Sequence, residues 1–141
     1  QNPEECSVTA RPAVVERGLS VSVLVCLLVP VLLLCAGLAV DGAGQAAANR
    51  RAEAVAAQAA RAGMDAAAPL SLAGRDGGPT AVAAAQSVLT AHPEIVGEVT
   101  FSSNGSLQVD TTTSVPSVFL GLVGIDRLPG RGSAAVELRP R

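Results

Sequence analysis

The longest charge-free and mainly apolar run in the chain extends from Leu19 to Val40 and covers 22 positions. As a helix it would be roughly 33 Å long, enough to cross a hydrocarbon core of about 30 Å. Only a helix can satisfy its backbone hydrogen bonds within a single lipid-exposed segment. The pattern therefore predicts one transmembrane helix, with Arg17 and Asp41 as membrane-edge residues. Pro30, near its middle, is expected to bend it.

A cleaved signal peptide is the competing interpretation of this run. Signal peptides have apolar regions of about 7 to 15 residues, followed by a small-residue cleavage site. The run here is longer, and its best small-residue site, Ala46 to Ala48, begins six residues beyond Val40. These features favour a retained membrane anchor.

The residues after Asp41 favour a helical extension that reaches Ala68, where Pro69 is expected to stop it. If Gly42 and Gly44 do not interrupt it, the helix is continuous from the apolar run. Small residues recur along this extension at alternating spacings of four and three, which is a heptad seam. Such a seam permits close packing against the chain's own domain or against a neighbour, and a solvent-exposed alanine helix is the alternative.

Small residues also recur at four-residue spacing at the end of the apolar run, where they would let another membrane helix approach closely. Chance in an alanine-rich chain is the alternative. Together with the seam they define a hypothetical assembly interface: Cys35, Ala39, Ala43, Ala48, Ala52, Val55, Ala59, Ala62 and Ala66.

The remaining residues predict a small α+β domain. After a turn-rich linker at 71–78, Pro79 opens a short helix that ends before Pro93. Two alternating segments then form a hairpin, which a three-residue loop at 103–105 closes. That loop pairs Phe101 with Leu107 and places its glycine in a left-handed conformation, whereas a two-residue turn would set apolar residues against polar ones.

The most apolar exported segment, 116–126, is too short to cross a membrane. It is expected to be a short core helix, with a docking surface as the alternative. A last strand is expected at 133–139, which brings the total to about three antiparallel strands. The predicted fold class is thus α+β, with a long N-terminal transmembrane or pilin-like helix, a short helix and these strands.

Composition narrows the possible functions. The net charge is −2, and the chain has no Lys, Tyr or Trp, so neither a basic patch nor base-stacking side chains support nucleic-acid binding. The cysteines, Cys6, Cys26 and Cys35, all precede the exported part. His92 is the single histidine, at the end of a predicted helix, and a surface or structural role is expected for it. We predict no catalytic residue, metal, cofactor or small-molecule substrate.

Two stretches resemble TadE/TadG-like proteins of Flp (Tad) pilus assembly, especially actinobacterial ones. The first is Arg17-Gly18, the apolar run with its central proline, and GLAVDGAGQAAANRRAEAVAAQAARAG at 37–63; the second is TTTSVPSVFLGLVGIDRLPGRGSAAVEL at 111–138. The family's pseudopilins are cut after a glycine that is followed, at the fifth position, by glutamate. Here that position holds Val23. We therefore expect no cut at Gly18, as in TadG-like members, which keep their anchor.

The resemblance implies a single-pass protein of the cell membrane with its N-terminus in the cytoplasm and its C-terminal domain outside. Four segments follow: a cytoplasmic tail at 1–18, the transmembrane helix at 19–40, its extension at 41–68, and the exported domain at 69–141. The leading hypothesis is a non-enzymatic minor pilin or pseudopilin of a Tad/Flp-type pilus or related secretion machine. Its partners would be the lipid bilayer, sibling TadE/TadG-like subunits and the pilus-assembly machinery. The alternative is a solitary membrane-anchored binding module or inhibitor.

Overall fold

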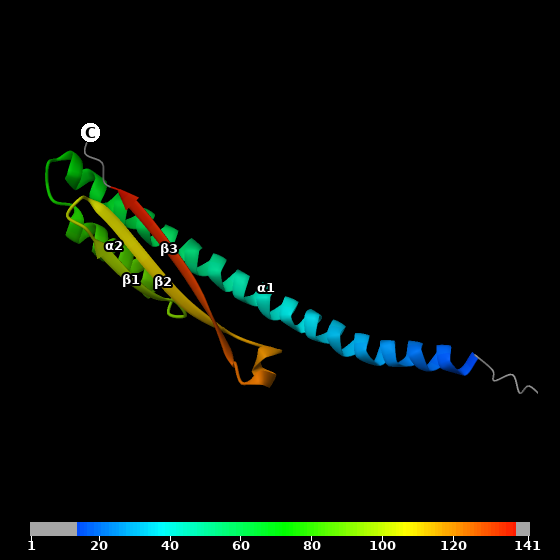
Figure 1. Ribbon diagram of the computed structural model, residues 1–141. Helices are drawn as coiled ribbons and strands as arrows, with labels where there is room; N and C mark the ends of the chain where they lie inside the picture. The colour runs from blue at the N-terminus through cyan, green and yellow to red at the C-terminus, as the bar shows by residue number, and fades with distance from the viewer. Residues whose placement is uncertain (1–13, 138–141) are drawn as a thin grey trace, which may run out of the picture. The chain divides into compact units, whose positions relative to one another are not determined.

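The computed structural model describes residues 14–137, and the side chains of residues 21–137. Its elements are helix α1 (Val14–Leu72), helix α2 (Gly78–Thr90), strand β1 (Val96–Phe101), strand β2 (Ser106–Pro116), the 3-10 helix η1 (Leu120–Val123) and strand β3 (Arg127–Glu137) (Figure 1). Two compact units are divided between Ala36 and Gly37, so the larger unit contains the rest of α1 and all later elements. The α+β class, with a long helix, a short helix and three antiparallel strands, is confirmed.

Helix α1 passes through Gly42 and Gly44 without interruption, so the apolar run and its predicted extension form one continuous helix. The expectation that Pro69 stops it is wrong, because the helix continues to Leu72. A proline removes only one helical hydrogen bond, and the stop signal lies further on, at Gly74. Gly74 has a φ of 70° and its N–H bonds to the Ser71 carbonyl, while the next N–H reaches back to Leu70 O at 2.8 Å. This is a Schellman-type helix end, for which glycine is the favoured residue.

Helix α2 and the β1–β2 hairpin follow the sequence prediction closely. Pro79 lies in the first turn of α2, whose start is also held by the Asp76 carboxylate, 2.9 Å from the Gly78 nitrogen. The hairpin pairs Phe101 with Leu107, and its three-residue loop ends at Gly105, which has a φ of 81°. The choice of the bulged loop is therefore confirmed. It wins because only this register keeps the apolar side chains of both strands on one face.

The strands form an antiparallel sheet in the order β1-β2-β3. Strand β3 begins at Arg127, six residues before the predicted start at Ser133. The remainder of that predicted strand, residues 138 and 139, lies outside the described part of the chain. Since β2 also extends to Pro116, the β2–β3 pair continues well beyond the end of β1 as a two-stranded arm.

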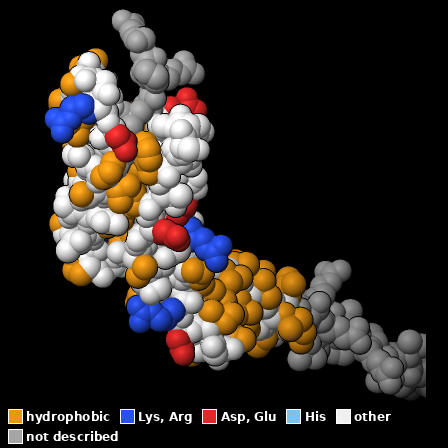
Figure 2. Space-filling model, turned by 90° about the vertical axis from the view of Figure 1, so that its left-hand side faces the viewer, with side chains coloured by type: hydrophobic (Ala, Val, Ile, Leu, Met, Phe, Trp, Pro, Cys, Tyr) orange, Lys and Arg blue, Asp and Glu red, His pale blue; other side chains and the backbone are white. Residues whose placement is uncertain are grey.

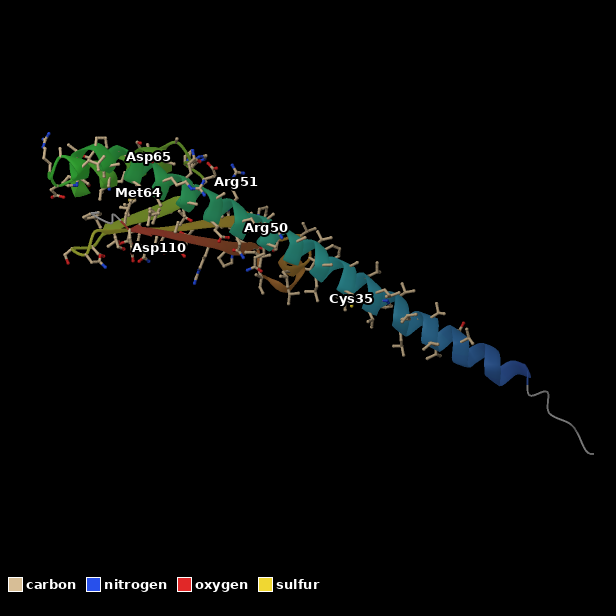
Figure 3. The ribbon with its side chains drawn as sticks, turned by 90° about the horizontal axis from the view of Figure 1, so that it is seen from above. Cys35, Arg50, Arg51, Met64, Asp65 and Asp110 are labelled. Atoms are coloured by element: carbon tan, nitrogen blue, oxygen red, sulfur yellow. The ribbon has the colours of Figure 1, made fainter. Side chains whose placement is uncertain are left out.

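The core consists mainly of small side chains. Eight buried residues form its centre: Ala56, Ala59, Ala60, Ala67, Ala81, Ala85, Leu107 and Val109. Because they come from α1, α2 and β2, both helices pack on the same face of the sheet. Polar residues alternate with the buried ones along β2, so Gln108 and Asp110 lie on the outer face (Figure 3). The two phenylalanines lie outside this buried centre: Phe101 is half-buried and packs against it, whereas Phe119 is exposed.

Helix α1 approaches β3 so closely that the strand carries no side chain at the contact. A Cβ atom added to Gly132 would overlap backbone atoms of Ala52 and Glu53, and one added to Gly130 would lie 2.8 Å from the Ala48 Cβ. The buried Thr111 fills the same layer, and its hydroxyl lies 2.8 Å from the Ala52 carbonyl oxygen. Alanine on the helix and glycine on the strand together allow this short distance.

The core-helix expectation for residues 116–126 is wrong. Strand β2 occupies the start of this segment, and only Leu120–Val123 form a helical turn, the 3-10 helix η1. Its large side chains are exposed, with Leu122 at 85% and Val123 at 78%. The physical reason is the length of the β2–β3 arm, which carries these residues past α2 and away from the core.

The close contact between α1 and β3 gives a test of this packing. Gly132→Ala should destabilise the sheet by about 1–3 kcal/mol, because the new Cβ meets helix backbone that has no room to move aside. Hydrogen exchange of the full chain in detergent measures this as lost amide protection in β2 and β3. The matched control is Gly121→Ala, whose Cβ would have its nearest neighbour at 3.7 Å and should change stability by less than about 0.5 kcal/mol. Equal protection in both variants would contradict the close contact.

Candidate functional site

The described side chains do not form a metal-binding cluster. Within residues 14–137, no group of three or more His, Cys, Asp or Glu residues could hold a metal ion. His92 follows the end of α2, with its Nδ1 3.6 Å from Glu94 Oε1, and Glu94 also accepts a 2.6 Å bond from Arg51. The pKa of Glu94 is lowered, first by its own backbone N–H and then by Arg51. This group of side chains lies on the surface.

Helix α1 provides the most distinctive surface of the chain. Its large apolar side chains from Val21 to Val40 are exposed, several of them by more than 60%. Figure 2 shows them as a band without charged side chains. Among the described residues, α1 is the one helix that is long and apolar enough to cross a membrane. The structure thus supports a single-pass membrane protein. The side chain of Arg17, the predicted charge at its first edge, lies outside the described side chains.

Asp41, the charge at the other edge, binds the backbone of a distant loop. One carboxylate oxygen accepts the N–H of Val118 at 2.8 Å, and the other accepts those of Phe119 and Leu120 at 2.9 and 2.7 Å. These N–H groups begin the η1 turn and have no partner within it, so Asp41 caps this turn from another element. The sequence had predicted Asp41 only as a charge at the membrane edge. In the structure, the buried Asp41 carboxylate instead has three backbone donors.

Asp41 is the first of three polar residues that attach the β2–β3 arm to α1. Gln45 Nε2 lies 3.4 Å from the Pro129 carbonyl oxygen, and Asn49 Oδ1 accepts the Arg131 N–H at 2.9 Å. Residues four apart lie on the same side of a helix, so the three form one row. We refer to Asp41, Gln45 and Asn49 as the polar row. The polar row was not predicted from the sequence, although a polar residue at every fourth position of an alanine-rich helix indicates a face that makes polar contacts.

The loop that Asp41 holds, residues 117–125, is compact and carries no charge. Ser117 N–H bonds to the Asp126 carbonyl at 3.0 Å, which closes the base of the loop, and the Ser117 hydroxyl donates to the Ile125 carbonyl. Gly124, with a φ of 90°, ends the η1 turn. On the helix, the Phe119 ring occupies the space where a side chain at position 37 would lie, so Gly37 makes this contact possible.

The nine residues of the hypothetical assembly interface fall into two groups. Ala48, Ala52, Val55 and Ala59 are buried by the chain's own strands and α2, and Ala62 and Ala66 are half-buried. The other three, Cys35, Ala39 and Ala43, are exposed. The structure therefore brings Ala48, Ala52, Val55 and Ala59 into the chain's own core, and the fully exposed members of the set are Cys35, Ala39 and Ala43.

A comparison with known proteins identifies the helix as the characteristic part of the chain. Residues 19–68 match the family model of putative Flp pilus-assembly, TadE/G-like proteins. Comparisons with curated proteins and with solved structures gave no match. The matched segment contains the apolar run and its helical extension, while the second resembling stretch, 111–138, lies outside it. Together, the match and the apolar helix support a pilus-related membrane subunit.

The hydrogen bonds of Asp41 predict that one substitution will free the loop. Asp41→Asn keeps the size of the side chain but replaces one acceptor oxygen with an N–H₂ group that faces N–H donors. Hydrogen bonds to a charged group contribute about 1.5–3 kcal/mol, so amide protection at 118–120 should fall roughly ten- to hundredfold. Hydrogen exchange on the full chain measures this. Asp110→Asn is the control, because Asp110 accepts only from the Gln108 side chain, and unchanged protection in Asp41→Asn would refute the cap.

Lowering the pH provides a second test of the Asp41 cap, in the unmutated chain. The N–H of Val118, then that of Leu120, lowers the pKa of Asp41 below its ordinary value of 3.8. At pH values above the ordinary pKa, the ionised Asp41 carboxylate stabilises the loop fully. This contribution is lost as the pH falls through the lowered pKa of the folded chain. Protection, corrected for the intrinsic rate, should therefore fall below about pH 4 in the unmutated chain and not in Asp41→Asn.

Proposed function

We propose that this chain is a pilin-like membrane subunit, a minor pilin or pseudopilin, of a Tad/Flp-type pilus or a related secretion machine. Helix α1 holds it in the cell membrane, with the tail in the cytoplasm and the α+β domain outside. The observation that carries this proposal is the extent of the family match, which follows α1 from residue 19 to residue 68 and includes none of the strands. What the chain shares with the family is thus the helix that would enter an assembly.

The proposed assembly surface is the small-residue strip of Cys35, Ala39 and Ala43. At 100° per residue, Ala39 and Ala43 lie on a different side of α1 from Gly37 and Asp41, which face the chain's own loop. Their exposure leaves this side free for another helix. The tight α1–β3 contact also favours assembly, because it keeps the domain close to one side of the helix.

A solitary membrane-anchored binding module is the second candidate. It is favoured by a shallow polar depression where α1 meets the outer strand, lined by Glu53, Asp110, Thr111, Thr112, Arg131, Gly132 and Ser133. The two candidates differ in whether the chain requires related subunits. A test of association therefore separates them.

The proposed topology predicts the behaviour of reporter fusions. A reporter that is active only outside the cytoplasm should be active when fused after Arg141 and inactive when fused before Leu19. The arginines flanking the apolar run do not decide this orientation, since Arg11 and Arg17 precede it and Arg50 and Arg51 follow it. The reverse pattern of activity would overturn the proposed orientation while leaving the membrane anchor in place.

The proposed assembly surface predicts the effect of a larger side chain. Ala39→Leu should reduce co-purification with TadE/TadG-like subunits of the same organism several-fold, because the larger side chain holds the helix axes apart. Leucine also favours helix formation, so the helix itself should persist. Val40→Leu, exposed and off the strip, is the matched control. If the unmutated chain associates with no such subunit, the solitary module gains; if Ala39→Leu associates normally, the strip is not the interface.

A further inference from the structure

We propose that loop 117–125 is a second membrane contact, which inserts into the interface of the bilayer that α1 crosses. The loop has five apolar side chains with substantial exposure: Val118, Phe119, Leu122, Val123 and Ile125. Leu122 and Val123 are more exposed than any large apolar side chain of the described span from Val21 to Val40. An apolar cluster of this kind, on an otherwise polar domain, marks a surface that contacts something other than water.

The level of the loop along α1 carries the argument. The loop contacts α1 at Gly37 and at Asp41, and both contacts lie within the larger compact unit. Gly37 belongs to the apolar run, whereas Asp41 is the first charge after it. At about 1.5 Å per residue, the position of Gly37 that the Phe119 ring contacts lies about 6 Å before Asp41, on the apolar side of this charge. Interfacial segments bury their apolar side about 5–10 Å deep, so the loop lies at the depth of the headgroup and acyl boundary.

The loop also has the hydrogen bonding that lipid contact demands. In an apolar medium, backbone N–H groups need protein partners. Asp41 accepts three of them, and four more, from Ser117, Leu122, Gly124 and Ile125, bond to carbonyls within the loop or at its base. Seven of the nine N–H groups therefore have partners inside the chain. A loop arranged in this way can leave water with most of its backbone donors already paired.

Lipid is favoured over a protein partner because the loop adjoins the last residues of the apolar run, 37–40, within the larger compact unit. The exposed Leu38 and Val40 of α1 belong to the same level as the loop contacts, so the apolar surface of the helix extends onto the loop. Residues 117–125 contain no charged group, whereas Asp126 and Arg127 follow directly, at the base of the loop. Arg127 is exposed there and can bind lipid phosphate. The inference rests on the membrane placement of α1 but not on a role in pili.

A fluorescent label tests the proposal in the full-length chain. Leu122→Cys, in a background with Cys6, Cys26 and Cys35 changed to Ser, carries a small polarity-sensitive dye, and the protein is reconstituted at low density into phosphatidylcholine–phosphatidylglycerol vesicles. We expect nitroxide-labelled lipids to quench this dye several-fold more strongly than aqueous iodide does. The matched control carries the dye on Gln108→Cys, on the outer face of the sheet, and should show the opposite preference.

Two further measurements make each outcome decisive. A dye on Leu28→Cys reports whether α1 is inserted; lipid quenching there, with iodide quenching at position 122, overturns the loop proposal alone. Lipid quenching at neither position overturns the membrane placement as well. If position 122 becomes shielded only when sibling subunits are added, or only at high protein density, the loop is a protein contact and the lipid proposal fails. Shielding at low density in vesicles of this chain alone supports it.

Discussion

The close approach of α1 to β3 is the constraint on which the rest of the α+β domain depends. Ala52 on the helix and Gly132 on the strand leave no space between the two backbones, and Thr111 bonds across the same layer. Small side chains remove little apolar area from water individually, but a short distance brings many more atoms into contact. A chain with only two phenylalanines can therefore build a core, provided that its helix and sheet pack without large side chains between them.

The polar row extends this contact toward the membrane. Beyond the core, hydrogen bonds from Gln45 and Asn49 attach the β2–β3 arm to α1. Asp41 then fixes the tip of the arm with three charge-assisted bonds. A single helix thus provides the anchor, one wall of the core and the attachment of the arm. Changes in this helix should consequently affect anchoring and domain structure together.

Exposure of the loop and burial of the seam both follow from the length of the β2–β3 arm. The arm runs along α1 and covers Ala48 and Ala52, which would otherwise face solvent or another helix. It also carries Leu122 past α2, where no core residue can reach it. The sequence favoured the core for the loop, with a docking surface as the alternative, and left the seam open to the chain's own domain or to a neighbour. The sequence correctly predicts that the seam and the loop are apolar surfaces, but which residues they contact depends on tertiary structure.

The sequence alone determined the features that depend on local patterns. An uncharged run long enough for a membrane, the bulged hairpin ending at Gly105, and the α+β class all follow from hydrophobic spacing and turn chemistry. Tertiary structure decided the features that depend on contacts between distant residues. The close contact of α1 with Gly132 of β3, and the cap that Asp41 provides to a loop 77 residues later, are of this kind. A residue pattern records which groups need partners, but only the fold brings a particular donor within 3 Å of a particular acceptor.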